Sequence, residues 1–221
     1  MMYLHKKIIL SLVVLLSWSC NPTKAQTNPL RDSLLIATHA LEQHTDSVDL
    51  RLKRASWYLL LEKWNSAKDD YDLILAHYPN NVAALFFRAY ANERLGRYGF
   101  ARQDYNNLLK LVPGHFEAQL GLILLNQKDK HYTEAMDGIN GLIEQYPTSA
   151  VAYAARAGME EERGLLTLAE YDYTQAIMRD PNNTDYIIQR IEVYRKQKKY
   201  EQAKRDAALL RKMGIAYRVE N

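Results

Sequence analysis

The sequence contains little cysteine, glycine or proline. One of its 221 residues is a cysteine, Cys20, so an intramolecular disulfide or a metal site built from several cysteines is excluded. Nine glycines and six prolines are too few for a collagen-like chain or a Gly/Pro-rich disordered chain. With 48% hydrophobic and 25% charged residues, the chain fits one folded domain or a short array of repeats.

No charge of one sign dominates once the first 25 residues are set aside. The whole chain has 29 Lys and Arg against 26 Asp and Glu, a formal net charge of +3. Lys6, Lys7 and Lys24 lie in the first 25 residues, so 29 minus 3 leaves 26 basic residues against 26 acidic ones. A nucleic-acid partner usually requires clustered positive charge, and we therefore expect none.

The N-terminus has the pattern of an export signal. His5, Lys6 and Lys7 precede an apolar run over residues 8–18. These eleven residues are too few to span a bilayer as a helix, which takes about 20. A basic start, a short apolar core and small residues after it predict a signal peptide over residues 1–25.

Two processing sites compete at the end of this leader. Thr23 and Ala25 place small side chains at the −3 and −1 positions of a signal peptidase I site, just after Pro22. The four residues ending at Cys20 resemble a bacterial lipobox, in which the cysteine is lipidated, although Trp18 departs from that pattern. We expect an exported protein, either periplasmic or an outer-membrane lipoprotein. A lipid anchor on Cys20 is the only membrane contact expected.

A 34-residue period runs through the rest of the chain. A proline recurs at this interval, with an alanine twelve residues before it and a Tyr or Ile eight residues before it. The prolines are Pro79, Pro113, Pro147 and Pro181; the alanines are Ala67, Ala101, Ala135, Ala169 and, continuing the series, Ala203; the larger residues are Tyr71, Tyr105, Ile139 and Tyr173. A fixed period of this length indicates an array of helical repeats.

Each period predicts two amphipathic helices. In the second period, apolar residues recur at helical spacing over about residues 82–95 and 99–111, and Pro113 follows the second helix. Small residues let paired helices approach closely, whereas the tyrosines wedge between them. Ile123 and Ile191 replace the small residue in the third and fifth periods, so we expect less regular helix crossings there.

These residues resemble the tetratricopeptide repeat over about residues 48–221. The resemblance implies an all-α fold, a right-handed superhelical array of helix-turn-helix repeats. The implied units are 48–81, 82–115, 116–149, 150–183 and 184–221, the last including a basic C-terminal cap. The residues that the family pattern assigns to repeat packing are Ala55, Tyr58, Ala67, Tyr71, Pro79, Ala89, Ala101, Tyr105, Pro113, Ala135, Pro147, Ala157, Ala169, Tyr173, Pro181 and Ala203.

Both flanks of the array are expected to cap it. Residues 26–47 predict a helix over about 30–44, with an apolar face of Leu34, Leu35, Ala37 and Leu41. Residues 189–221 contain ten Lys and Arg and four Asp and Glu. This basic end is either a solvated cap or a surface for an acidic partner or anionic lipid.

The sequence shows no recognisable catalytic chemistry. The histidines beyond the leader lie at spacings that do not share a helical face, and no zinc-protease, P-loop or nucleophile-elbow pattern occurs. Glu160, Glu161 and Glu162 are consecutive, so on a helix they point in different directions. We therefore expect a non-enzymatic protein with no cofactor and no metal.

The remaining candidate site is the concave groove of the array. In the family, certain first-helix positions line that groove, and here six residues at those positions form our candidate binding set. They are Phe86, Tyr90, Arg94, Leu120, Leu124 and Lys128. Phe86 and Tyr90 lie one helical turn apart on one face. The alternative is that the curvature of the array or the N-terminal helix buries this strip.

Three hypotheses about function follow. The first is a scaffold of the cell envelope that binds a segment of a partner protein in its groove. The second is a structural subunit of an envelope assembly, held through its convex face or basic C-terminal end. The third, an enzyme or regulatory module fused to the repeats, is disfavoured because little sequence lies outside the array.

Overall fold

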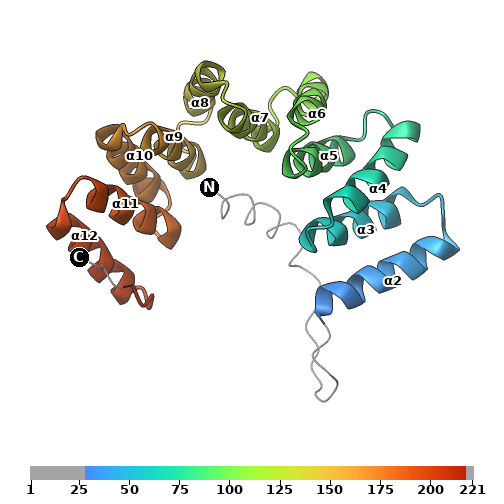
Figure 1. Cartoon of the computed structure of the whole chain (residues 1–221), viewed down its shortest axis with the longest axis horizontal. Helices are drawn as coiled ribbons and strands as arrows, with labels where there is room; N and C mark the ends of the chain where they lie inside the picture. Colours follow the sequence, from blue (N-terminus) through green and yellow to red (C-terminus); the bar gives the residue numbers. More distant parts are fainter. Residues whose placement is uncertain (1–27, 218–221) are drawn as a thin grey trace, which may run out of the picture.

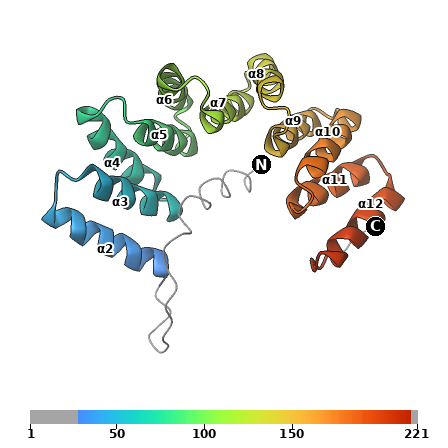
Figure 2. The same cartoon turned by 180° about the vertical axis from the view of Figure 1, so that it is seen from behind.

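The structure, a computed structural model, describes residues 28–217 as an open arc of α-helices. Figure 2 shows the same arc from behind. The leader, its two processing sites and Cys20 lie outside the described residues. No strand occurs in the part of the chain that the structure describes. The all-helical repeat array predicted from the sequence is confirmed.

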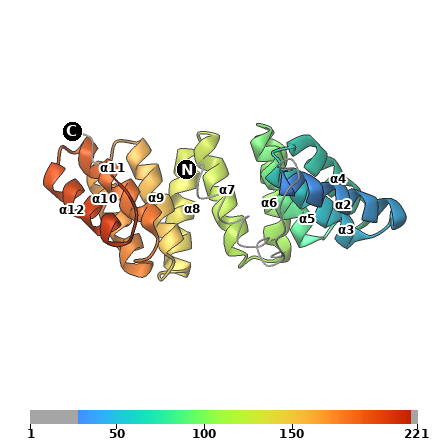
Figure 3. The same ribbon diagram turned by 90° about the horizontal axis from the view of Figure 1, so that it is seen from below.

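The arc consists of one N-terminal helix followed by five helix pairs. The helices are α2 (Pro29–Gln43), α3 (Val48–Leu60), α4 (Trp64–His77), α5 (Val82–Arg94), α6 (Tyr98–Leu111), α7 (Phe116–Lys128), α8 (Tyr132–Gln145), α9 (Ala150–Glu162), α10 (Leu166–Arg179), α11 (Thr184–Lys196) and α12 (Tyr200–Lys212). The first helix of a pair faces the inside of the arc and the second lies toward the outside (Figure 1). Seen from below, the helices stand side by side along the long axis (Figure 3).

The first helix of every pair begins at a capping residue, and these caps recur once in every repeat. A side-chain atom of each cap accepts a hydrogen bond from a backbone N–H in the first turn, for example Asn81 Oδ1 from Ala84 at 2.9 Å. The five caps are Ser47, Asn81, His115, Ser149 and Asn183. Such a cap satisfies a donor that the helix itself leaves unpaired. It therefore sets where each repeat starts.

The turn inside each pair follows the same register. One residue in each turn adopts a left-handed conformation, with φ between 58° and 74°. The five residues are Glu62, Gly96, Lys130, Gly164 and Lys198. Glycine adopts this conformation without strain, whereas other residues do so at a cost. Three of the five turns therefore form without the favoured residue.

The four periodic prolines lie in exposed turns between repeats, shortly after the end of each second helix. Their exposure differs from the packing role that the family pattern suggested for Pro79, Pro113, Pro147 and Pro181. A proline disfavours helical backbone in the residue before it and has no N–H to continue the helix. These prolines stop helices rather than fill the core.

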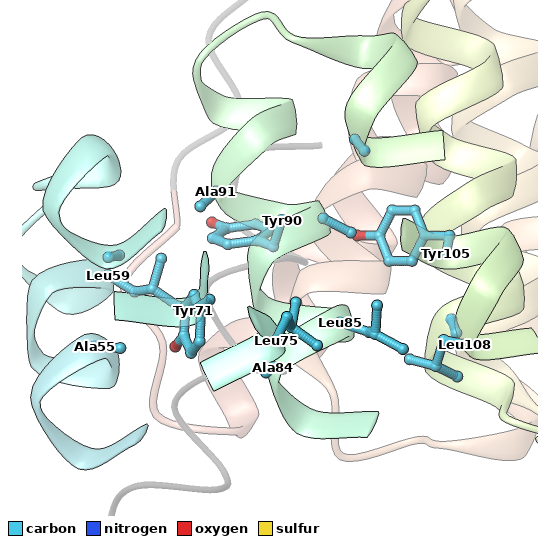
Figure 4. Packing of buried hydrophobic residues seen from close by; sticks show 14 of the residues in the cluster. Ala55, Leu59, Tyr71, Leu75, Ala84, Leu85, Tyr90, Ala91, Tyr105 and Leu108 are labelled. Atoms are coloured by element: carbon cyan, nitrogen blue, oxygen red, sulfur yellow. The ribbon is translucent and has the colours of Figure 1, made fainter. Parts of the chain in front are cut away.

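The core consists of four clusters of buried small, aliphatic and aromatic residues between the helices. The alanines of the family pattern have 0% of their surface exposed, whereas Tyr58 is only partly buried. These alanines are Ala55, Ala67, Ala89, Ala101, Ala135, Ala157, Ala169 and Ala203. Figure 4 shows how Tyr71, Tyr90 and Tyr105 lie between the helices of the first two repeats. Close helix approach at the alanines leaves the gaps that these rings fill.

Helix α2 covers the first pair with a narrower apolar face than the sequence predicted. Ala37 and Leu41 are buried and Leu34 is partly buried, but Leu35 and its neighbour Ile36 are exposed. The face follows the three-to-four spacing of a single helical stripe, and Leu35 falls outside it. None of the described helices is long and apolar enough to cross a membrane.

Candidate functional site

An arginine–aspartate pair joins the two helices in four of the five repeats. The arginine of the first helix donates two hydrogen bonds to a buried aspartate 16 residues later; Arg88, for example, donates Nε–H to Asp104 Oδ2 at 2.8 Å and Nη2–H to Oδ1 at 2.6 Å. The pairs are Arg54–Asp70, Arg88–Asp104, Arg156–Asp172 and Arg190–Asp206. A guanidinium matches a carboxylate in this two-bond geometry, which fixes orientation as well as charge. We call these four the intrarepeat clamps.

The third repeat has no such clamp. Leu122 and Gly138 occupy the two positions, which correspond to those of Arg88 and Asp104 in the preceding repeat. Ile123 packs against Gly138 so closely that a Cβ atom on Gly138 would lie 2.8 Å from Ile123 Cγ1. An apolar contact therefore replaces the ion pair at this point of the array.

The structure buries three of the six residues expected to bind a ligand in the groove. Tyr90 is 5% exposed, Leu120 1% and Leu124 3%. The Tyr90 ring meets the edge of Trp64, from the preceding pair, at 5.9 Å between ring centroids. These side chains pack between neighbouring helices, so the open apolar strip expected from the sequence is not present.

Phe86 is only partly buried, but its ring also has partners. It meets Tyr105 edge-on at 6.0 Å and stacks on the ring of His115 at 5.8 Å between centroids. It also meets Phe87 edge-on at 5.2 Å, so Phe86 is a partly buried ring of the inner helix α5 with three aromatic neighbours.

Arg94 and Lys128 lie in the last turns of the inner helices α5 and α7. The Arg94 guanidinium stacks over the Trp64 ring at 4.7 Å. Lys128 is exposed, with its Nζ 3.4 Å from Glu93 Oε1 and 5.6 Å from the centre of the Tyr98 ring. Both cations thus lie against aromatic rings, as cations do when a ring face attracts them.

Polar contacts link the inner helices of successive repeats on this side of the arc. Lys128 of α7 meets Glu93 of α5, Gln127 of α7 donates to Glu162 of α9 at 2.7 Å, and Lys196 of α11 meets Glu161 of α9 at 2.7 Å. We call these six residues, Glu93, Gln127, Lys128, Glu161, Glu162 and Lys196, the concave polar row. The row runs along four of the five inner helices.

Two oxygens of the concave polar row are buried without a donor. They are Oε2 of Glu93 and Oε1 of Gln127, which occupy equivalent positions in neighbouring repeats. Both residues are 4% exposed, and no hydrogen-bond donor within residues 28–217 reaches either oxygen. A buried acceptor without a partner costs free energy and is uncommon in folded proteins. Both oxygens are enclosed by the chain itself, so the side chains of the row that are exposed to solvent are Lys128, Glu162 and Lys196.

Glu160 is a further buried carboxylate, near the clamp of the fourth repeat. Burial and the neighbouring Asp172 carboxylate raise the pKa of Glu160 to about 7, although the Arg156 guanidinium opposes this shift. Its Oε2 atom also lacks a donor among the described residues. Glu160 therefore changes charge close to neutral pH.

No cluster of three or more His, Cys, Asp or Glu side chains within residues 28–217 has a geometry that could hold a metal ion. The consecutive glutamates 160–162 illustrate why. Glu160 is buried near Asp172, Glu161 pairs with Lys196, and Glu162 accepts from Gln127. The three carboxylates thus have three different surroundings.

Sequence reasoning missed both the clamps and the concave polar row. Each had a signal in the sequence, because the clamp arginines recur at multiples of the repeat length and the partners within the row are 35 residues apart. Familiar catalytic patterns join residues that are close in sequence, whereas these partners lie one helix or one repeat apart.

The comparisons with known proteins agree with this fold. A tetratricopeptide repeat family model matches residues 49–81, the first helix pair. The chain is also 36% identical over 99 residues, 45% of its length, to the tetratricopeptide repeat and J domain-containing co-chaperone DNJ1 of Fusarium oxysporum f. sp. lycopersici. The match covers 19% of that relative, so the chain spans about a fifth of its length.

Solved structures extend the likeness over most of the chain. A tetratricopeptide repeat protein from Parabacteroides merdae has a TM-score of 0.75 and 26% identity, covering 86% of this chain and 74% of that one. YrrB, described as a TPR protein with an unusual peptide-binding site, has a TM-score of 0.52 and 15% identity, covering 78% of this chain and 89% of that one. The helix register, the family model and the solved structures together support a tetratricopeptide-repeat protein.

Proposed function

We propose that this chain is a non-enzymatic scaffold that holds a segment of a partner protein on the inner face of its arc. The observation that carries the proposal is the line of exposed charged side chains in the concave polar row, Lys128, Glu162 and Lys196. They lie on neighbouring inner helices at equivalent positions of successive repeats. An extended segment running across these helices presents side chains at regular intervals, and charged side chains of the segment can pair with such a row.

Two further side chains of the inner helices define the ligand. Phe86 of α5 is partly exposed next to His115 at the start of α7, while Lys128 is an exposed cation in the last turn of α7, about 20 Å along that helix. Tyr90, Leu120 and Leu124 support this surface from beneath rather than contact the ligand. The expected ligand is a segment with an apolar side chain at one end and an acidic one at the other, long enough to reach both ends of α7.

The relatives support an interaction role at the level of the fold. The name of the YrrB structure records a peptide-binding site in a tetratricopeptide repeat protein, and the Fusarium relative is a co-chaperone. Tetratricopeptide repeats expose an extended concave surface because each repeat is rotated slightly against the previous one. The partner of this chain is proposed to be a protein, not a nucleic acid.

Site-specific photo-crosslinking in cells tests the proposal. A crosslinking residue at position 128 or 162, on the concave polar row, should capture the same partner protein. The matched control is position 110, an exposed lysine on the second helix α6, which should not capture it. A partner captured equally well from both faces would contradict groove binding.

A substitution then tests the exposed cation of the row. Lys128→Met removes the charge while keeping a side chain of similar length, and we expect about a tenfold weaker complex with the captured partner. Lys110→Met, on the exposed surface of α6, is the control and should leave affinity unchanged. Equal affinities for both variants would remove Lys128 from the proposed site.

We also propose that the protein is exported to the cell envelope. The support is the leader pattern of residues 1–25, with cleavage after Ala25 or lipidation of Cys20 as the two routes. Mass spectrometry of the N-terminus distinguishes them, since the first route yields a chain starting at Gln26. Release of the protein from membranes by Cys20→Ala would select lipidation, and a cytoplasmic protein with an intact leader would refute export.

The alternative function is a structural subunit held through its outer face or basic end. The observation that favours it is the exposed basic surface of α12, where Lys204, Arg205, Arg211 and Lys212 are all exposed. This alternative predicts crosslinks to another envelope protein from α12 and none from the concave polar row.

A further inference from the structure

The second helix of the fourth repeat, α10, carries an exposed apolar stripe. Leu168 is 51% exposed, Tyr171 59% and Met178 71%. Their spacing of three and seven positions places them on one face of the helix, with Gln175 between them. The helix lies toward the outside of the arc (Figure 1), so this stripe is part of the outer face.

The repeat itself supplies an internal comparison for this stripe. The same four positions, one repeat earlier and one repeat later, belong to α8 and α12. In α8 they are Glu134, Asp137, Gly141 and Glu144, and in α12 they are Gln202, Arg205, Leu209 and Lys212. The outer face therefore changes from acidic on α8 to apolar on α10 to basic on α12. In α4 and α6 the equivalent residues follow no such order: they are Ser66, Asp69, Leu73 and Ala76, then Phe100, Gln103, Asn107 and Lys110.

The charges on either side of the stripe are exposed and unpaired within the described chain. Asp137 and Glu144 have no Lys or Arg within ion-pair distance among residues 28–217, and α8 contains no basic residue. Arg205 and Lys212 likewise have no carboxylate partner there. Charges sorted by sign onto two flanking helices are a pattern that a complementary surface can match.

We propose that a second copy of this chain docks on this outer face, with a two-fold axis running along α10. In such a dimer the same surface is used by both copies, so it must be complementary to itself. An axis parallel to α10 places α10 against α10 and α8 against α12 of the second copy. An axis perpendicular to the helices would instead place acidic α8 against acidic α8.

The side chains match in this arrangement when equivalent positions of the repeats face each other. Asp137 faces Arg205 of the second copy, and Glu144 faces Lys212 of the second copy. The small residue Gly141 faces Leu209 of the second copy, which is exposed. Each of these charged residues on the flanking helices thus meets one of opposite sign.

Gly141 adds no bulk to the α8 flank of this arrangement. A Cβ atom on Gly141 would contact nothing within 4 Å in the chain, and the same is true of Gly99 on α6. The apolar stripe of α10 and the charges sorted by sign on α8 and α12 therefore carry the proposal.

The curvature of the outer face agrees with the distribution of side-chain types. Two convex surfaces approach most closely at their centre and separate toward the edges. The apolar stripe lies at the centre, and the flanks carry the long side chains of Glu, Arg and Lys, which can reach across a wider gap. An apolar centre with a charged rim is the usual composition of a protein interface.

Sedimentation velocity of the purified chain over a range of concentrations tests the proposal. We expect a reversible dimer, and Tyr171→Glu should weaken it by roughly 100-fold because it places two carboxylates at the axis. Gln103→Glu, an exposed change at the equivalent position of α6, should leave dimerisation unchanged. Circular dichroism should show equal helicity for both variants, since both positions are exposed.

The decisive experiment exchanges the charges of the two flanking helices. One variant combines Asp137→Lys with Glu144→Lys, and the other combines Arg205→Glu with Lys212→Glu. Each alone should be monomeric, because its α8 and α12 then carry like charge. Mixed together, they should form a heterodimer. The basic α8 of the first variant then faces the acidic α12 of the second, and the basic α12 of the first faces the acidic α8 of the second.

Three results would overturn the proposal. They are a wild-type chain that stays monomeric up to roughly 100 μM, a dimer indifferent to Tyr171→Glu, and a mixture of the charge variants that associates no better than either variant alone. Crosslinking from the concave polar row is independent of all three, because that row lies on the opposite side of the arc.

Discussion

The third repeat and the other four hold their two helices together in different ways. In the four, an arginine of the first helix clamps a buried aspartate of the second. In the third, Leu122 and Gly138 occupy those positions, and Ile123 fills the space above Gly138. The helix pair forms in both cases, because either a bidentate ion pair or a close apolar contact joins the helices at the same height.

In the fifth repeat, a larger residue on one helix is balanced by a smaller residue on the other. It keeps the pair of Arg190 with Asp206 but has Ile191 where three other repeats have alanine, and Ala207 where three have tyrosine. Both residues are buried in the same cluster. A larger residue on one helix is thus matched by a smaller one on the other, so the summed volume is kept.

Removal of a clamp should have the largest effect. Arg88→Ala leaves the Asp104 carboxylate buried without its partner, and we expect a loss of about 3–5 kcal/mol in the free energy of unfolding. Urea denaturation followed by circular dichroism measures this loss. Leu122→Ala, the same position in the third repeat, leaves no carboxylate behind and should cost less. Equal losses would show that the clamps contribute no more than apolar packing.

The apolar contact of the third repeat should be sensitive to a single added methyl group. Gly138→Ala would place its Cβ 2.8 Å from Ile123 Cγ1, so we expect a loss of roughly 1–3 kcal/mol despite the better helix propensity of alanine. Adding Ile123→Ala should relieve the clash. Gly141→Ala, on the same helix with open space around it, is the control and should stabilise the monomer.

The fourth repeat should respond to pH through Glu160. Its pKa in the folded chain is raised from the ordinary value of 4.5 to about 7, so the folded state binds this proton more tightly than the unfolded state. The wild type should therefore lose stability relative to Glu160→Gln as the pH rises from 4.5 through 7. We expect a difference on the order of 3 kcal/mol above neutral pH, measured by urea denaturation at several pH values. A difference that does not change with pH would contradict this assignment.

The turns should show the smallest effect. Lys130 of the third repeat has a φ of 63°, and Gly96 has the equivalent place in the second repeat with a φ of 73°. Lys130→Gly should stabilise the chain by about 1 kcal/mol because glycine adopts this conformation without strain. The reciprocal change, Gly96→Lys, should destabilise it by a similar amount. Thermal unfolding midpoints of the two variants should therefore shift in opposite directions.

Local spacing was sufficient to predict the fold class and the position of each helix pair. The repeat period, the small residues at helix crossings and the prolines after each second helix all act within one repeat or between adjacent repeats. Helix starts and stops depend on residues a few positions away. Interactions between residues this close in the chain can be recognised in a single sequence.

The exposure of individual side chains was decided by tertiary structure. Tyr90 has the same helical face as Phe86, yet it is buried because Trp64, from the preceding helix pair, packs against its ring. The concave polar row likewise depends on partners one repeat apart, and the order of acidic, apolar and basic helices emerges only when α8, α10 and α12 are aligned on one face. The sequence determined a helix for each of these residues and the side of the helix on which it lies. Whether that side meets solvent, a ring or a charge depends on neighbours brought there by the packing of other helices, and helical periodicity carries no information about them.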